Sequence, residues 1–96
     1  MKVESKKSFN KDISKIRDRK LLQRIKTVIQ QIESASSILQ VHNLKKLSGS
    51  DNAYRIRIGE YRMGFYLVNN IVELTVFDNR KDIYKNFPLQ IKFPRP

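Results

Sequence analysis

The chain has 96 residues and a formal net charge of +11. This length predicts one domain, residues 1–96, with a modest core. So strong a basic bias points to a nucleic acid, an anionic surface or an acidic protein as partner. The lack of cysteine excludes disulfides and thiol-ligated metals. No apolar stretch is long enough to span a membrane, and residues 1–11 lack the apolar core of a secretory signal, so we expect a soluble cytoplasmic protein.

The first part of the chain predicts a strand and then a helix. Residues 2–5 are expected to form a short strand that pairs with a sheet formed later in the chain. Ser8 is then expected to cap a helix, because serine is a favoured N-cap residue. Phe9, Ile13 and Ile16 follow at helical spacing and give this helix one apolar stripe.

A second helix has the clearest pattern in the chain. Asp18 is placed to cap it, and it fades in the serine-rich residues 34–37. The two helices are expected to form a hairpin on the apolar face of the sheet. Residues 38–51 are expected to be a connector, with Leu44 and Leu47 holding it to the core. The stripe of the second helix comprises Leu21, Ile25, Val28, Ile29 and Ile32.

The stretch 54–77 alternates apolar and polar residues with a period of two, which predicts three antiparallel strands. Turns are expected at 59–60 and 69–70, because Gly and Asn tolerate left-handed backbone angles. Two-residue turns fix which residues face each other. The predicted pairs are Arg57 with Arg62, Ile56 with Met63, Phe65 with Leu74, Met63 with Val76, and Tyr61 with Asp78.

This register divides the sheet into an apolar face and a basic face, because directly opposed residues lie on the same side. Opposed like charges are destabilising. The arginines are therefore either a solvated outer face or a site built for an anion, for which guanidinium groups are well suited. The predicted apolar face carries Tyr54, Ile56, Ile58, Met63, Phe65, Leu67, Val72, Leu74 and Val76, and the basic face carries Arg55, Arg57, Arg62, Gly64, Tyr66, Glu73 and Thr75.

A basic segment follows the last strand. Helical spacing would place Arg80 and Tyr84 on one side, and the register delivers them to the end of the sheet that carries Arg57 and Arg62. The tail, residues 88–96, contains three prolines, which argue against a long helix. We expect it to be an extended arm, adding a strand or staying mobile until a partner binds.

Metal chemistry has no support in the sequence. His42 is the only histidine, and the carboxylates are scattered. A lone histidine is more often a surface or packing residue than a ligand or a base. We therefore expect no metal and no small-molecule cofactor.

The order of these elements resembles the RelE/ParE toxin superfamily of bacterial toxin–antitoxin modules. The residues that carry the resemblance are Leu44-Lys45-Lys46-Leu47-Ser48-Gly49, Tyr54 to Arg62, and Asn79-Arg80-Lys81-Asp82-Ile83-Tyr84. The resemblance implies an α+β fold of order β-α-α-β-β-β, with an N-terminal strand and a helical hairpin on an antiparallel sheet, and a short C-terminal helix or turn.

The resemblance also implies a function. RelE-type toxins cut mRNA in the ribosomal A site without a metal, and an antitoxin protein neutralises them. The implied partners are a cognate antitoxin, the ribosome with its 16S rRNA, and mRNA. The implied catalytic residues are Arg57, Arg62, Arg80 and Tyr84, and the implied RNA-binding residues are Arg55, Arg57, Lys45, Lys46, Lys81 and Lys85.

Two departures from the family pattern leave alternatives open. Some relatives have lysine where this chain has Arg55 or Arg57, and arginine is a poor general base. Many relatives also have Gly-His before the residue that matches Arg80, where this chain has Asp78-Asn79. Asp78 and Glu60 are candidates to replace that histidine, but nothing in the sequence shows that either does, and the general base stays unassigned. The alternative functions are a ParE-like inhibitor of DNA gyrase and a non-toxic small RNA-binding protein.

Overall fold

A computed structural model describes residues 1–88 of the chain, and the tail from residue 89 onward lies outside the described residues. Within residues 1–88, five strands form one sheet in the order β1-β5-β4-β3-β2. The elements are β1 (Lys2–Ser5), α1 (Lys7–Ser14), α2 (Arg19–Ser34), the 3-10 turn η1 (Ile38–Gln40), β2 (Leu44–Lys46), β3 (Ala53–Ile58), β4 (Tyr61–Val68), β5 (Ile71–Asn79) and α3 (Ile83–Asn86).

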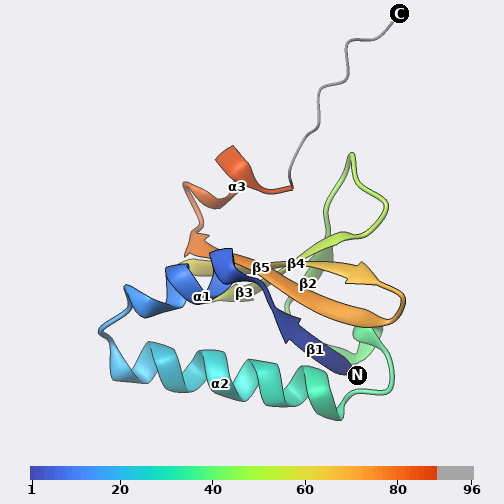
Figure 1. Ribbon diagram of the computed structural model, residues 1–96, viewed down its shortest axis with the longest axis horizontal. Coiled ribbons are helices and arrows are strands. Elements are labelled where there is room, and N and C mark those ends of the chain that lie inside the picture. The colour runs from blue at the N-terminus through green and yellow to red at the C-terminus, as the bar shows by residue number, and fades with distance from the viewer. Residues whose placement is uncertain (89–96) are drawn as a thin grey trace, which may run out of the picture.

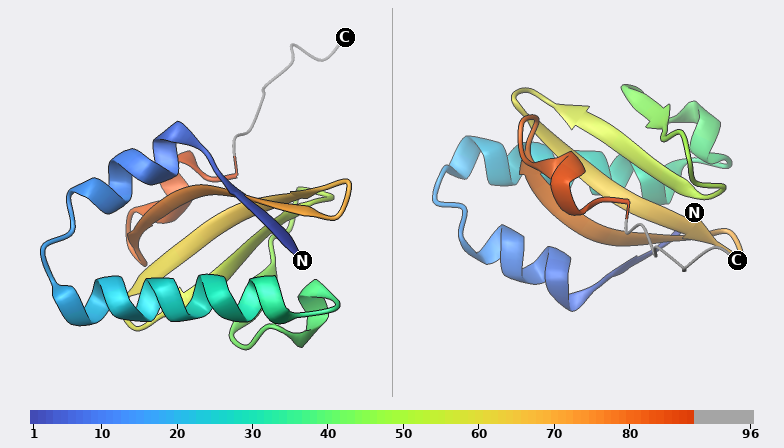
Figure 2. Two further views of the ribbon diagram at one scale, coloured as in Figure 1. Left: turned by 60° about the horizontal axis from the view of Figure 1, so that its bottom comes forward. Right: turned by 90° about the horizontal axis from the view of Figure 1, so that it is seen from above.

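The helices lie on both sides of the sheet. Helices α1 and α2 cover one face, and α3 lies over the opposite face, as Figure 1 shows with α2 below the sheet and α3 above it. Figure 2 shows the same arrangement from two further directions. The predicted α+β fold is confirmed, with one refinement: β1 joins the sheet parallel to β5, so the sheet is mixed. None of the described helices is both long and apolar enough to cross a membrane.

The two long helices show one correct and one wrong cap. Asp18 caps α2 as predicted, since its carboxylate accepts hydrogen bonds from the backbone N–H groups of Lys20 and Leu21 at 2.9 and 3.2 Å. Ser8 does not cap α1, which already begins at Lys7. The Ser8 hydroxyl instead donates to the Thr75 carbonyl at 2.6 Å, and so ties α1 to β5.

The main core lies between the helical hairpin and the sheet. Met63 and Phe65 of β4 are fully buried at its centre, and Phe9 and Ile32 bring α1 and α2 onto them. Apolar burial of this kind is the dominant favourable term in folding. The buried members of the main core are Phe9, Leu21, Ile25, Ile32, Ile38, Val41, Ile56, Ile58, Met63, Phe65, Val72, Leu74 and Phe77.

The predicted register holds for the β3–β4 hairpin and fails for part of β4–β5. Arg57 faces Arg62 and Phe65 faces Leu74, as predicted. The structure has an irregularity between Gly64 and Phe65, where Gly64 pairs with Val76 and Phe65 with Leu74. Thr75 is therefore an extra residue, a β-bulge that shifts the rest of β5 by one position.

Because of the bulge, three predictions about β5 are wrong. Met63 faces Phe77 rather than Val76, and Tyr61 faces Asn79 rather than Asp78. Phe77 consequently belongs to the main core, where it is 4% exposed. Val76 moves to the opposite face, the one that carries the arginines.

A second, smaller core lies on that opposite face. Ile83 and Phe87 from the α3 segment cover Ala53 of β3, with Tyr66 and Val76 partly buried beside them. Gly64 makes this contact possible, because a Cβ there would lie 2.6 Å from Val76 Cγ1 and 2.8 Å from the Phe87 ring. Glycine inside a strand often marks such a close approach. The basic face is therefore solvated over only part of its area.

The predicted connector contains a strand. Leu44 pairs with Ile56 and Lys45 with Arg55, so β2 adds an edge to β3. Leu47, just beyond β2, is buried in the second core. Both leucines therefore hold this segment to the sheet, as predicted, although the connector had not been predicted to form a strand.

Candidate functional site

Four basic side chains lie together on the second face of the sheet, and we call them the arginine face: Lys45, Arg55, Arg57 and Arg62. Arg57 is directly opposite Arg62, and Lys45 is directly opposite Arg55. Like charges in such positions repel each other. Two repulsive pairs side by side form a strongly positive surface next to the second core.

Asn43 orders two members of this face. It has a positive φ of 63° and precedes β2. Its backbone carbonyl accepts a hydrogen bond from Arg55 Nη1 at 2.8 Å, and its side-chain oxygen accepts one from Arg57 Nη2 at 3.5 Å. Arg55 is half-buried by this contact, whereas Arg57 is exposed. Arg57 is therefore better placed than Arg55 to reach a ligand.

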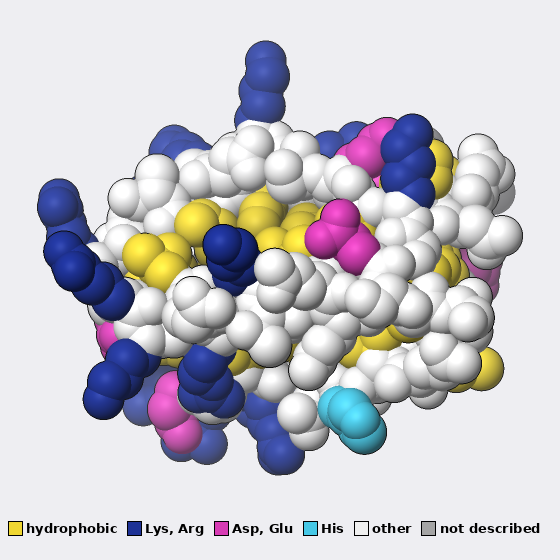
Figure 3. Space-filling view, turned by 90° about the horizontal axis from the view of Figure 1, so that it is seen from below, with side chains coloured by type: hydrophobic (Ala, Val, Ile, Leu, Met, Phe, Trp, Pro, Cys, Tyr) yellow, Lys and Arg dark blue, Asp and Glu magenta, His cyan; other side chains and the backbone are white. Residues whose placement is uncertain are grey.

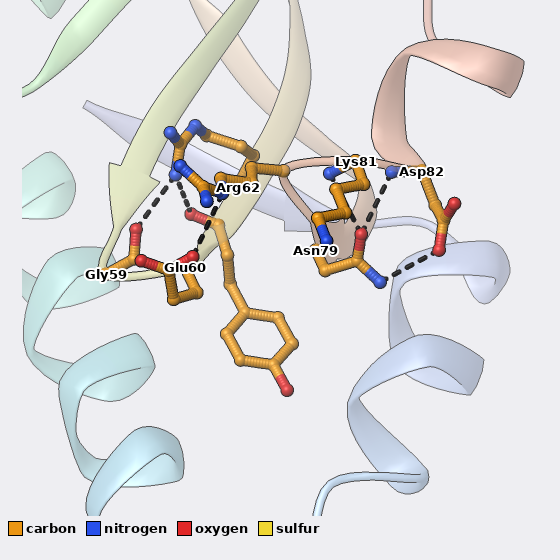
Figure 4. A network of polar contacts seen from close by, with 8 residues as sticks. Gly59, Glu60, Arg62, Asn79, Lys81 and Asp82 are labelled. Carbon is orange, nitrogen blue, oxygen red and sulfur yellow. Dashed lines mark hydrogen bonds and ion pairs between the residues drawn. The ribbon is translucent and has the colours of Figure 1, made fainter.

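Arg62 lies over the β3–β4 turn. Its Nη1 donates to the carbonyls of Gly59 and Tyr61, both at 2.9 Å. Figure 4 shows Arg62 near the turn, with Asn79 at the end of β5 and Asp82 beyond it, next to α3. The contacts among the described residues use one of its nitrogens only. The remaining guanidinium N–H groups are then available to a ligand.

Arg80 is held at the same turn. Its backbone N–H donates to the Glu60 carbonyl at 2.9 Å, and its Nε forms an ion pair with the Glu60 carboxylate at 3.0 Å. Arg80 lies between β5 and α3, not in a helix, so the predicted helical pairing of Arg80 with Tyr84 is wrong. The Gly59–Glu60 turn nevertheless contacts Arg62 and Arg80 together.

The remaining predicted residues are distributed unevenly. Tyr84 is 50% exposed on α3, the helix that covers the second face. Lys81 and Lys85 are exposed in the same segment. Lys46 is the exception: it faces Tyr54, which packs against the main core, so Lys46 lies on the other face from the arginines.

Asn79 and Asp82 shape the chain between β5 and α3. The Asn79 side-chain oxygen accepts from the backbone N–H groups of Lys81 and Asp82 at 2.9 Å, a side-chain turn typical of Asn. Asp82 accepts from the Asn79 amide and pairs with Lys85, both at 2.9 Å. The hydrogen bond from Lys85, followed by that from Asn79, lowers the pKa of the Asp82 carboxyl.

This carboxyl provides a pH prediction. A depressed folded-state pKa means that the contacts of Asp82 are stabilising above its unfolded pKa, near pH 4, and that this stabilisation is lost as pH falls through the folded value. Carboxyl NMR titration should therefore find the pKa of Asp82 below that of an ordinary aspartate. Lys85→Met should raise the pKa of Asp82, while Lys26→Met on α2 should leave it unchanged. An Asp82 pKa that is the same in wild type and Lys85→Met would contradict the assignment.

Among residues 1–88, the candidate proton acceptors near the arginines are His42, Asp78 and Glu60, and none of them is assigned as the base. His42 is exposed in the η1–β2 connection. Asp78 is the cross-strand partner of Arg62, and Glu60 is paired with Arg80. Among residues 1–88, no group of three His, Cys, Asp or Glu residues is arranged to hold a metal ion.

Sequence reasoning missed the residues that support this face. Asn43 gave no signal beyond the tolerance of asparagine for positive φ. The ion pair of Glu60 with Arg80 depends on how the chain leaves β5, which the bulge changes. Gly64 did give a signal, a glycine inside a strand, that could have pointed to the Phe87 contact.

The chain is similar to two known toxins, although no protein-family model matches it. Toxin RelE3 from Methanocaldococcus jannaschii is 34% identical over 89 residues, which cover 92% of this chain and 100% of that protein. The putative toxin RelE1 from the same organism is 28% identical over 67 residues, covering 68% of this chain and 74% of the relative.

Solved structures show the same likeness. The crystal structure of the RelB–RelE antitoxin–toxin complex from Methanococcus jannaschii contains a chain with a TM-score of 0.74 and 31% identity, covering 88% of this chain and 98% of that one. YafQ from E. coli strain BL21(DE3) has a TM-score of 0.60 at 14% identity, covering 85% and 96% of the two chains. At that identity YafQ supports the fold alone.

Proposed function

Because the chain belongs to the RelE family of toxins, we propose that it is the toxin of a type II toxin–antitoxin module and cuts mRNA on the ribosome. In this proposal it works in the cytoplasm, contacts mRNA and the 16S rRNA, and needs no metal ion. A cognate antitoxin protein neutralises it. The reaction class is endonucleolytic cleavage of RNA.

One observation carries the proposal: Arg57 faces Arg62 across two strands, and the turn next to them also holds Arg80. Opposed arginines destabilise a sheet. An anion that binds between them removes the repulsion, and the RNA phosphate is a ligand with the matching charge and geometry. Among the described residues, no carboxylate forms an ion pair with Arg57 or Arg62, although Asp78 lies directly opposite Arg62.

The chemistry assigned to this site is internal transesterification. The 2′-oxygen of one nucleotide attacks the adjacent phosphorus as its proton passes to water, and the bond from phosphorus to the 5′-oxygen of the next nucleotide breaks. The leaving 5′-oxygen gains a proton, and a 2′,3′-cyclic phosphate remains. Arg62 and Arg80 stabilise the charge of the phosphorane, and Arg57 holds the phosphate.

The other predicted residues have supporting roles in this proposal. Tyr84 stacks on an unpaired base or donates the proton to the leaving oxygen. Arg55, Lys45, Lys81 and Lys85 contribute positive potential along the RNA. Lys46 lies on the other face of the sheet, so it is left to contact rRNA or the antitoxin.

A protein partner is supported by an apolar surface away from the arginines. The partly exposed Ile13, Leu22 and Ile29 line a groove of about 320 Å³ between α1 and α2, together with the buried Phe9 and Ile25. Figure 3 shows apolar side chains gathered in a hollow on this face, with lysine and arginine side chains around it. Exposed apolar patches with a polar border often mark protein–protein contacts.

Controlled expression in a bacterium tests the proposal. We expect translation, followed by labelled amino-acid incorporation, to stop soon after induction. Mapping of mRNA 5′ ends should then show new cuts at fixed positions within codons. Purified toxin should cut an mRNA that occupies the ribosomal A site, and the same mRNA without ribosomes should stay intact.

Two results would contradict it. Altered plasmid supercoiling with filamentation and a DNA-damage response, without mRNA cuts, would indicate a gyrase inhibitor instead. Normal growth at a verified level of folded protein would remove the toxin function altogether. Co-expression with its antitoxin is the matched control, since it should restore translation in the first case.

A further inference from the structure

A hollow at the end of the sheet has no role in the reaction described above. It measures about 420 Å³ and lies between the α1–α2 connection and the ends of β4 and β5. Tyr61 and Phe77 line it from the sheet, and Lys15 and Arg17 line it from the connection. It adjoins the β3–β4 turn that holds Arg62 and Arg80.

Tyr61 gives this hollow an aromatic wall. Its ring stacks on Phe77 with centroids 5.3 Å apart and an angle of 7° between the planes. Phe77 is buried at 4% exposure, so it holds the Tyr61 ring in a fixed plane, while Tyr61 itself is 37% exposed. A ring that is already fixed and partly exposed loses little conformational entropy when a ligand binds. It can therefore stack well on another planar ring.

The charges around the hollow favour a base over a phosphate. Asp12, Asp18 and Asp78 line it together with the two cations. All three carboxylates already have backbone partners: Asp12 accepts from Phe77 N–H, Asp18 caps α2, and Asp78 accepts from Asn79 N–H. Ionised carboxylates only accept hydrogen bonds. They would repel a phosphate and attract the amino groups of adenine, cytosine or guanine.

The position of Tyr61 links the hollow to the arginine face. Tyr61 directly precedes Arg62, and successive residues of a strand point to opposite faces. The Tyr61 carbonyl accepts a hydrogen bond from Arg62 Nη1. A nucleotide chain that crosses this end of the sheet can therefore place a phosphate at Arg62 and the adjoining base at Tyr61.

We propose that this hollow is a nucleobase subsite, in which Tyr61 stacks on the base of a nucleotide next to the phosphate held by Arg62 and Arg80. The subsite deepens the proposed function, because it assumes that the phosphate belongs to single-stranded RNA. Its Asp-rich border favours bases with an amino group over uracil. Tyr61 is thus a binding residue that influences where the RNA is cut.

Fluorescence of a Tyr61→Trp variant tests the subsite directly, since the chain has no other tryptophan. We expect saturable quenching with short single-stranded RNA, weaker with oligouridine, and lost when the base beside the bound phosphate is abasic. Leu39→Trp is the control, because Leu39 is 82% exposed and lies outside this hollow. Equal quenching in both variants, or no effect of the abasic position, would overturn the proposal.

Binding and cutting by a second pair of variants separate the two proposals. Tyr61→Leu should weaken RNA binding by roughly 5- to 150-fold, the usual range for loss of one base stack, and Tyr61→Phe should stay near wild type. If wild type does not cut RNA but the quenching and this difference persist, the subsite stands without the nuclease. If the wild-type protein cuts RNA, and Tyr61→Leu binds RNA and selects cleavage sites in the same way as wild type, the proposed subsite is wrong.

Discussion

Replacing Arg62 with alanine is expected to slow mRNA cleavage by roughly a hundred- to a thousand-fold, the usual cost of removing one transition-state donor. The guanidinium has N–H groups left over from its two contacts with the turn, and these are the donors assigned to the phosphorane. Single-turnover cleavage on programmed ribosomes measures the rate. Binding of RNA should change less than the rate, because the donor acts mainly when charge develops.

Two control variants make this result specific. Arg19→Ala removes the same charge from an exposed position on α2, on the other side of the sheet, and should cut as wild type does. Arg62→Lys keeps the charge but loses the planar guanidinium, so its cleavage rate should lie between those of Arg62→Ala and wild type. The fold should persist, since the lost hydrogen bonds are worth about 1 kcal/mol each. A cleavage rate for Arg62→Ala equal to that of Arg19→Ala would remove Arg62 from the catalytic set.

The sequence predicts correctly those parts of the site whose strand pairing is set by a nearby turn. The Gly59–Glu60 and Asn69–Asn70 turns both use positive φ values, which these residue types allow. The first turn fixes the β3–β4 register completely, and so the pairing of Arg57 with Arg62 was predicted correctly. Near the second turn, Phe65 and Leu74 were also paired correctly.

Prediction failed where distant segments decide the local structure. The bulge at Thr75 lies where the Ser8 hydroxyl reaches the Thr75 carbonyl, a contact between residues 67 positions apart. No pattern within β5 reveals it, because Val76 and Phe77 are both apolar and either could face the core. The second core was missed for the same reason, since Gly64 and Phe87 are far apart in sequence.

The second core is also what connects α3 to the site, and it leads to the second large expected effect. Phe87→Ala should detach the α3 segment from the sheet. Phe87 is 2% exposed and packs on Tyr66 at 5.1 Å between centroids, directly over Gly64. Loss of a buried phenylalanine typically costs about 3–5 kcal/mol, more than the backbone hydrogen bond from Phe87 to Ile83 contributes, at about 1 kcal/mol.

Detachment has a structural and a functional readout. Amide hydrogen exchange should speed up across residues 83–87, while the amides of β3 and β4 stay protected by the main core. Cleavage should fall as far in Phe87→Ala as in Tyr84→Ala, and the double variant should be no slower than either one, because both remove Tyr84 from the same place.

Conservative variants decide what the segment does. Phe87→Leu keeps most of the buried apolar volume and should keep α3 docked and RNA cleavage largely intact. Tyr84→Phe keeps the ring but not the hydroxyl, so full cleavage by Tyr84→Phe would assign Tyr84 to base stacking, and a loss equal to that of Tyr84→Ala would assign it to proton donation. Phe87→Ala could release residues 83–87 while cleavage continues at the wild-type rate. In that case α3 and Tyr84 have no part in the reaction, and the catalytic residues are only the arginines of β3 and β4 and Arg80 at the turn.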